Sequence, residues 1–370
     1  MDDVLNQTLP VQQGPAAGRT GSLALLHRRL NEAQAFGPAY DGAMSNHLPM
    51  ALHAAWEMGA EAERLQRLVD GDRLKLEAAT PASAAVEADA RRAAEPLQTG
   101  IGAADEWLIH RGQPADYPWL QAYFSALLAG LTPRAVLAAH LPVLLGAPHA
   151  FAFHGLIRVA HAVESAHTAE LAAALATWAA WWELLPAGPR GGEPLAPAAW
   201  AEALREQARA RRSELPMIQF RMRIAAGTPI YAALAERLAP AASLAERREQ
   251  LLAVAREAYL HSRNFTVLHL ITGLRALRVL LPALPPDTDP QPLIAALDRA
   301  AVAGWLAGRV QWQDEAPAST PPPWPALHRA ALAQSDEHVI KGVHACWQED
   351  LRAPHPHWRR VAARMLEGRA

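Results

Sequence analysis

Apolar residues recur at helical spacing along almost the whole chain. Alanine and leucine dominate these positions, β-branched residues are sparse, and no alternating apolar–polar run reaches strand length. Prolines and glycines gather mainly between the periodic segments, where they end helices. The pattern predicts an all-α protein, with helices over roughly residues 22–34, 47–70, 85–97, 117–130, 133–145, 153–185, 197–211, 229–237, 242–259, 264–281, 291–309, 325–350 and 356–368.

Proline-rich breaks separate several of these helices, but they are too short and too evenly spread to divide the chain into domains. No self-similarity at 30–45 residues is present, which argues against a solenoid. A chain of 370 residues can bury one large core. We therefore expect a flexible N-terminus over residues 1–20 and one helical-bundle domain over residues 21–370, with a metal site between helices.

Composition and charge exclude several classes of protein. The net charge is −2 and no basic block stands out, which argues against nucleic-acid or anionic-membrane partners. Cys346 is the only cysteine, so an intrachain disulfide and a thiolate metal cluster are impossible. The N-terminus has no signal-peptide pattern, and apolar runs such as 134–147 break before membrane-spanning length. We expect a cytoplasmic protein, of an oligomeric state that the sequence does not indicate.

Histidines are the candidate functional residues of this chain. Nucleophile-elbow, HExxH, CxxC, Walker A and dinucleotide-binding signatures are missing. The chain has 16 histidines, and several lie in four apolar helical segments, at 45–60, 153–166, 263–277 and 336–347. Imidazoles that project inward from different helices are how helical bundles build metal sites.

Each histidine also has a plain structural explanation, because a single imidazole in an apolar helix is usually a core residue bonded to a carbonyl or carboxylate. We interpret His53, His161 and His344 in that way. The lysines are more unusual: only Lys75 and Lys341 are present, so 33 of the 35 Lys and Arg residues are arginine. Lys341 is either an ion-pairing residue or a residue with a special task beside a histidine.

Four quoted segments carry a resemblance to a known family. "NHLPMALHAAWEMGA", "HGLIRVAHAVE", "NFTVLHLITGLRAL" and "DEHVIKGVHA" resemble, in the right order, four blocks of the questin oxidase-like family. They span about residues 40–350. That family takes its name from a fungal ring-cleaving oxygenase of anthraquinone metabolism, described as Baeyer–Villiger-type. Members are also described as non-heme iron dioxygenases that hold the metal with four histidines and a carboxylated lysine.

The resemblance implies a specific ligand set: His47, His154, His269, His338 and a carboxylated Lys341. This chain departs from the pattern at one point, because some members have a second histidine three residues after the first, where this chain has Met50. If that second histidine were the ligand, His53 would be the nearest substitute.

A lysine is chemically suited to the fifth position. A buried lysine can lose its proton and take up CO₂, whereas arginine stays protonated. The resulting carbamate is an anionic oxygen ligand that offsets part of the charge of a divalent ion. Imidazole and oxygen donors suit iron, manganese or zinc, and oxygen activation favours Fe2+.

The resemblance therefore implies an oxidoreductase that uses O2 on a small aromatic, polyketide- or anthraquinone-like molecule. Trp56, Arg158, Phe265 and Trp347 are the candidate substrate-binding residues, because each is close to a proposed ligand in sequence. Two alternatives stay open: an NADPH-dependent Baeyer–Villiger-type oxygenase without a stable metal, and a non-enzymatic helical protein that binds a small molecule.

Overall fold

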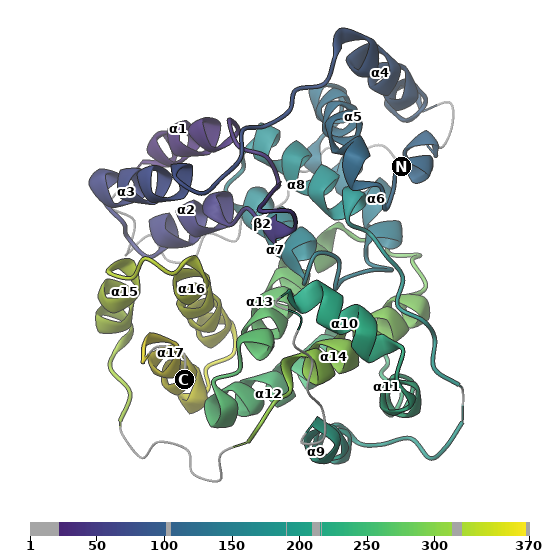
Figure 1. Ribbon diagram of the computed structural model, residues 1–370, viewed down its shortest axis with the longest axis vertical. Coiled ribbons are helices and arrows are strands. Elements are labelled where there is room, and N and C mark those ends of the chain that lie inside the picture. Colours follow the sequence, from purple (N-terminus) through teal and green to yellow (C-terminus); the bar gives the residue numbers. More distant parts are fainter. Residues whose placement is uncertain are drawn as a thin grey trace.

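The computed structural model describes residues 22–100, 105–189, 191–208, 215, 217–312 and 320–367. The N-terminal segment expected to be flexible, residues 1–20, lies outside this part of the chain. The described residues form an α-helical protein with one two-stranded hairpin, so the all-α prediction is confirmed (Figure 1).

The elements are α1 Leu23–Ala33, β1 Ala39–Tyr40, β2 Met44–Ser45, α2 Leu48–Glu57, α3 Ala62–Arg73, α4 Ala84–Thr99, α5 Tyr117–Gly130, α6 Pro133–Leu144, α7 His154–Glu164, α8 Thr168–Ala180, α9 Pro197–Ala208, α10 Ile218–Ala226, α11 Pro229–Leu234, α12 Leu244–Ser262, α13 Phe265–Leu280, α14 Pro290–Gly308, α15 Trp324–Leu332, α16 Glu337–Arg352 and α17 Pro356–Leu366, with short 3-10 turns at Glu106–Ile109, Pro114–Asp116 and Leu281–Ala283.

Three long predicted helices are each divided in two by a local backbone signal. Residues 47–70 split because Gly59 adopts a left-handed conformation with φ of 90°. Residues 153–185 split at Ala166, which has φ of 51°. Residues 325–350 split before Asp336, whose side chain caps α16 by accepting a hydrogen bond from the backbone N–H of His338. Helix α10 and the β1–β2 hairpin were not predicted.

Four helices form the central bundle. Helix α2 packs on α7, α7 on α13, α13 on α16, and α16 back on α2, so the four make a closed ring (Figure 1). The stretch Phe265–Ala283, which contains α13, is long and apolar enough to cross a membrane by length and composition, but 72% of its apolar window is buried. Its packing against α7, α12, α14 and α16 accounts for that apolar character.

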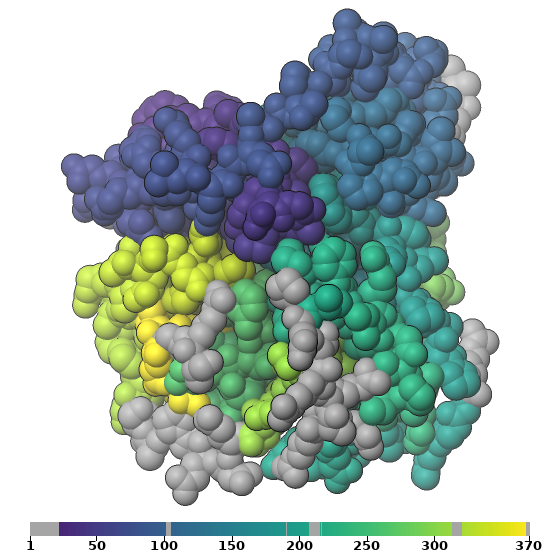
Figure 2. Space-filling model, in the orientation of Figure 1, coloured from purple at the N-terminus to yellow at the C-terminus, as the bar shows by residue number. Residues whose placement is uncertain are grey.

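The ring brings distant parts of the sequence together. Helix α2 lies against α16, almost 300 residues later in the chain, and α1 and α3 cover the outer side of α2. Figure 2 shows the N-terminal segment, in purple and blue, lying beside the yellow C-terminal segment on one face. Segments from the early and the late part of the described chain therefore complete one bundle. A site inside this bundle forms only after these distant segments have packed together.

Helices α7 and α8 approach closely at Gly155. A Cβ atom at this position would lie 2.7 Å from Trp178 Cγ and 2.8 Å from Trp178 Cα. Because one of these atoms belongs to the backbone, α8 would have to move to accept a side chain. Gly155 also follows His154, so the position of that histidine depends on this contact.

We expect Gly155→Ala to lower the free energy of unfolding by about 2–3 kcal/mol, because overpacking forces backbone shifts. Gly71→Ala is the matched control, since a Cβ at Gly71 in α3 meets nothing within 4 Å. There the change should stabilise by about 0.5–1 kcal/mol through helix propensity. Urea unfolding of both variants measures the pair, and equal effects would show that the α7–α8 contact is not tight.

Candidate metal centre

Four imidazoles come together where the bundle helices begin. His47 immediately precedes α2, His154 is the first residue of α7, His269 is in the second turn of α13, and His338 is the second residue of α16. All four side chains are buried or largely buried. Because the helices start at the same end of the bundle, their positive N-terminal dipole ends converge here. This field favours neutral imidazoles and an anionic ligand.

The four rings follow the cyclic order of their helices. The ring centroids of His47 and His154 lie 4.6 Å apart, and their Nε2 atoms are 2.8 Å apart. The other neighbouring pairs have centroids 4.3–5.3 Å apart: His154 with His269, His269 with His338, and His338 with His47. Ligand nitrogens of His47, His154 and His338 lie within 4.8 Å of one another, close enough to share one ion, and the His269 ring lies beside them.

Hydrogen bonds select the tautomer of three of these rings. His154 Nδ1 donates to the carbonyl oxygen of Phe151 at 2.6 Å, and His269 Nδ1 donates to that of Phe265 at 2.9 Å. His338 Nδ1 donates to the Asp336 carboxylate at 2.8 Å. These oxygens only accept, so each Nδ1 carries the hydrogen and each Nε2 is the ring nitrogen with the lone pair that can bind an ion. This is the usual arrangement of a metal-binding histidine.

A left-handed turn places His154. Phe151, Ala152 and Phe153 have φ of 55°, 55° and 69°, a conformation that costs an L-residue about 1–2 kcal/mol. The turn directs the carbonyl of Phe151 at the His154 ring. Packing holds it, because the Phe153 ring lies where Gly273 and Gly304 leave room, with a Cβ at Gly273 only 3.1 Å from that ring. Strain of this kind is characteristic of functional sites.

A cavity of about 530 Å³ opens above the four histidines, within the size range of small-molecule sites. All four rings contribute to its wall. The rest is mostly apolar or aromatic and comes from the hairpin, the 151–152 turn, α10 and the start of α13. The lining residues are Tyr40, Ala43, Met44, Ser45, His47, Phe151, Ala152, His154, Met217, Ile218, Gln219, Phe265, His269, Ser335, Asp336, Glu337 and His338.

A family model described as questin oxidase-like matches residues 44–346. The chain belongs to the questin oxidase-like family. None of the curated proteins compared with it matches significantly. The matched region contains the four bundle helices that carry the imidazoles, and family membership implies an oxidoreductase.

The four predicted histidine ligands of this family member lie at one end of the bundle. The structure brings His47, His154, His269 and His338 together. His47, rather than His53, lies beside His154, and Met50 is fully buried in α2 without lining the cavity. The departure from the family pattern at Met50 therefore leaves the four-histidine group intact.

Lys341 lies one helical turn beyond His338 on α16 and is 2% exposed. Burial lowers the pKa of its amine to about 8. Its charge in turn helps to depress the pKa values of His47 and His154, after the larger effect of their own burial. A buried lysine whose amine is partly neutral near physiological pH can react with CO₂, which a surface lysine paired with an acid does much less readily.

The other lysine of the chain, Lys75, lies beside the first residue of α16. Lys75 contacts the Glu337 carboxylate and lies 3.0 Å from Asp72. Burial, followed by a hydrogen bond to Glu337, raises the pKa of Asp72 to about 7. Glu337 is thus engaged by Lys75, and Asp336 is the carboxylate that orients a ligand ring. Of these two adjacent acids, Asp336 therefore makes the contact with His338.

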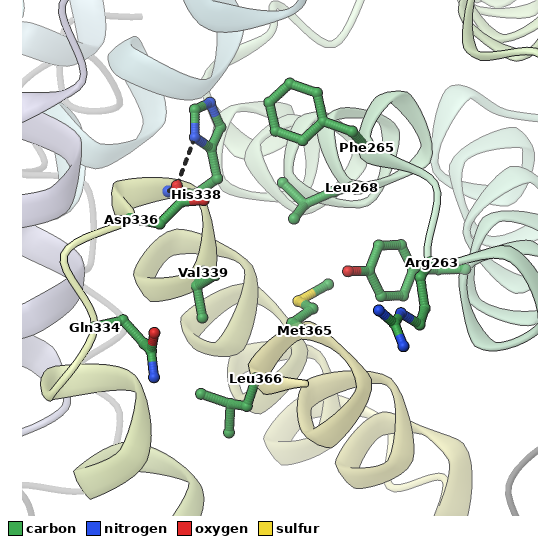
Figure 3. Close-up of a pocket in the computed structure, with 10 residues that line it drawn as sticks. Arg263, Phe265, Leu268, Gln334, Asp336, His338, Val339, Met365 and Leu366 are labelled. Atoms are coloured by element: carbon green, nitrogen blue, oxygen red, sulfur yellow. Dashed lines mark hydrogen bonds and ion pairs between the residues drawn. The ribbon is translucent and has the colours of Figure 1, made fainter. Parts of the chain in front are cut away.

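A second, smaller cavity of about 100 Å³ lies behind the same wall. Figure 3 shows His338 bonded to Asp336, with Phe265 and Leu268 on one side and Val339 and Met365 below. His338 and Phe265 line both cavities. The Phe265 ring packs edge-on against His338, with centroids 4.7 Å apart, and limits how far that imidazole can rotate.

Three of the four predicted substrate-binding residues do not line the main cavity in the described part of the chain; Phe265 does. Arg158 is buried and makes two hydrogen bonds to Glu170, at 2.6 and 3.0 Å. Trp56 is buried in α2, and Trp347 packs on His328. These side chains lie away from the cavity because successive helical residues rotate by about 100°, so neighbours of a ligand often face elsewhere.

The sequence analysis missed most of the cavity wall. Tyr40 and Met44 come from the unpredicted hairpin, and Ile218 and Gln219 from the unpredicted helix α10. Met44 and Phe151 each lie three residues before a proposed ligand, so their positions could have suggested them. Ile218 and Gln219 are far from any ligand in sequence and reach the cavity only through the fold.

Proposed function

We propose that this protein is a non-heme iron oxygenase that acts on a small aromatic, polyketide-like molecule, with the ion held by His47, His154, His269, His338 and a carboxylated Lys341. The observation that carries the proposal is the convergence of the four rings. Three of the imidazoles also donate their Nδ1 hydrogen to fixed acceptors, and all four rings line one largely apolar cavity. A single core histidine such as His140 also bonds a carbonyl through Nδ1, but its ring does not meet three other imidazoles at a cavity wall.

The donor set fits a divalent transition metal. Imidazole nitrogens with one anionic oxygen suit Fe2+, Mn2+ and Zn2+, and Fe2+ can supply the oxygen-activating chemistry that the family implies. A carbamate on Lys341 would offset part of the ionic charge in a site that is otherwise neutral, because burial keeps the pKa values of His47 and His154 well below the usual value.

The remaining wall would bind and orient the substrate. Phe265, Phe151 and Met44 offer apolar surface to a flat ring system, while the Tyr40 hydroxyl and the Gln219 amide offer hydrogen bonds to its oxygens. The cavity size accommodates two or three fused rings. The same walls would exclude bulk water from the reacting centre.

Metal analysis and oxygen uptake test this proposal together. Protein expressed with added iron should contain iron and should consume O2 with a hydroxylated polycyclic aromatic compound, without NADPH. Substoichiometric iron, manganese and zinc would count against it, and NADPH consumption with an anthraquinone would favour the reductant-dependent alternative. A protein that binds the aromatic compound without turnover would be the non-enzymatic alternative.

We expect Asp336→Asn to weaken metal binding by about 10–100-fold, since partners of ligand imidazoles contribute this much. The amide can still accept the capping hydrogen bond from the His338 backbone, so α16 should keep its start. What is lost is the negative charge on the Nδ1 side of the His338 ring. Competition with a chelator measures the change, and unchanged affinity would show that Asp336 only caps the helix.

A further inference from the structure

A second group of histidines lies deeper in the same four-helix bundle. Six residues after His47 on α2 comes His53, seven after His154 on α7 comes His161, and six after His338 on α16 comes His344. All three are buried, with 1–5% of each residue exposed. None lines the cavity above the first group. The spacing places this second layer about 9 Å farther along the helices, so no ligand is shared between the layers.

The three rings of the second layer surround one point. Their centroids lie 5.1 Å apart for His53 and His161, 5.5 Å for His161 and His344, and 5.8 Å for His53 and His344. The point equidistant from them is about 3.2 Å from each centroid, which is the separation expected when an imidazole nitrogen binds an ion at about 2.0–2.1 Å. The Nδ1 atoms of His53 and His161 are 2.8 Å apart.

A carboxylate completes the group. Glu164, one helical turn after His161, offers an oxygen within 4.8 Å of the facing nitrogens of His53 and His161. Its Oε1 accepts a hydrogen bond from Arg275 at 2.6 Å, while its Oε2 is buried without a hydrogen-bond partner among the described residues. His344 Nε2 is likewise buried and unpaired there. A buried unpaired carboxylate oxygen is costly, and an ion would satisfy it.

Arg275 explains why this layer has three imidazoles and not four. It lies six residues after His269 on α13, where a fourth histidine would repeat the first layer. Its guanidinium donates a hydrogen bond to the Glu164 carboxylate at 2.6 Å and so holds that group in place. His53, His161 and Glu164 have ligand atoms within 4.8 Å of one another, and the His344 ring lies beside them as the fourth donor.

We propose that His53, His161, His344 and Glu164 form a second, structural metal site for a tetrahedral divalent ion of the zinc type. The described cavities do not reach it, so neither substrate nor O2 has access through them. The ion would link α2, α7 and α16 below the first layer and fix the positions from which the upper histidines project. The inference stands independently of the iron oxygenase proposal, because the two ligand sets have no residue in common.

Metal counting on the full-length protein tests this site. Protein expressed with iron and zinc should contain two ions per chain. Glu164→Gln and His161→Gln should each remove one ion and leave the other, and His47→Gln should remove the other one. His140→Gln is the matched control: His140 is an equally buried histidine that bonds Val136 and Tyr123 and belongs to neither group. It should keep both ions.

Cobalt substitution gives a second measurement that does not depend on activity. Co2+ in a tetrahedral site absorbs visible light much more strongly than in a five- or six-coordinate one. The strong bands should persist in His47→Gln and disappear in Glu164→Gln. Glu164→Gln is the informative variant if His161→Gln fails to fold, because Glu164 is partly exposed at the end of α7 and its amide can still accept from Arg275.

The outcomes separate the two proposals. A single ion that is lost in Glu164→Gln but kept in His47→Gln would support the second site and contradict the first. A single ion that is lost only in His47→Gln would overturn the second site, and its polar atoms would then hold water. Two ions that survive both His161→Gln and Glu164→Gln would also overturn it.

Discussion

Lys341→Arg is expected to lose its metal and its turnover, although charge and length are almost conserved. Arginine stays protonated and cannot take up CO₂, so the anionic oxygen ligand disappears and a permanent cation takes its place beside the ion. Loss of an outer partner of a ligand already weakens metal binding by about 10–100-fold, and loss of a direct ligand should exceed that. Metal content after purification and O2 uptake measure the effect.

Lys75→Arg is the matched control, because Lys75 is the only other lysine and contacts Glu337 at the start of α16, the helix that carries Lys341. Its ion pairs with Glu337 and Asp72 need only a cation, so this change should cost no more than about 1 kcal/mol and keep the metal. Removal of CO₂ and bicarbonate should weaken metal binding in the parent protein. Full metal content in Lys341→Arg would contradict the carbamate.

The protein is expected to lose stability steeply as the pH falls below about 6.5. Burial lowers the pKa of His140 to about 4 and that of His149 to about 3. The folded-state pKa values lie below the unfolded value of about 6.5, so the unfolded chain binds more protons between them. The stability is present above pH 6.5 and is lost toward pH 4, at up to about 1.4 kcal/mol per pH unit for each histidine.

Several other groups contribute to this slope. Burial also lowers the pKa values of His47, His154, His161 and His344, which adds to the loss in acid. Asp72 and Asp298 act in the opposite direction, because burial raises both pKa values to about 7 and their neutral forms favour the fold at low pH. Two acids offset about two histidines, so the net effect remains a loss.

Urea unfolding at pH 7.5, 6.5 and 5.5 measures the slope. His140→Gln removes one titrating group that belongs to neither histidine cluster. The stability difference between the parent and this variant should therefore shrink as the pH falls, by up to about 1.4 kcal/mol per unit below pH 6.5. A constant difference would mean that His140 can be protonated without cost in the folded protein.

Helical periodicity in the sequence predicted the position of most helices. The segment predicted at 117–130 coincides with α5, and 264–281 differs from α13 by one residue at each end. The failures were local: the divisions at Gly59 and Ala166 depend on single residues in a left-handed conformation. A glycine can adopt such a conformation or a helical one, so spacing alone does not predict which occurs.

The sequence placed the upper histidines in helices but did not separate them from the lower ones. His53, His161 and His344 were interpreted as core residues because each is a single imidazole in an apolar segment. Only the tertiary structure shows that they face one another, as His47, His154 and His338 do. The signal was present in the recurrence after six or seven residues on three helices.

The sequence by itself determined the helical class, the buried character of the histidine-bearing segments, and the chemical types available at a metal site. Those properties depend on composition and on spacing within one helix. The tertiary structure alone decided which faces of α2, α7, α13 and α16 meet, that Phe265 but not Trp56, Arg158 or Trp347 reaches the cavity, and that the hairpin and α10 close it. Contacts between segments hundreds of residues apart depend on how whole helices pack, and the pattern within each helix does not contain that information.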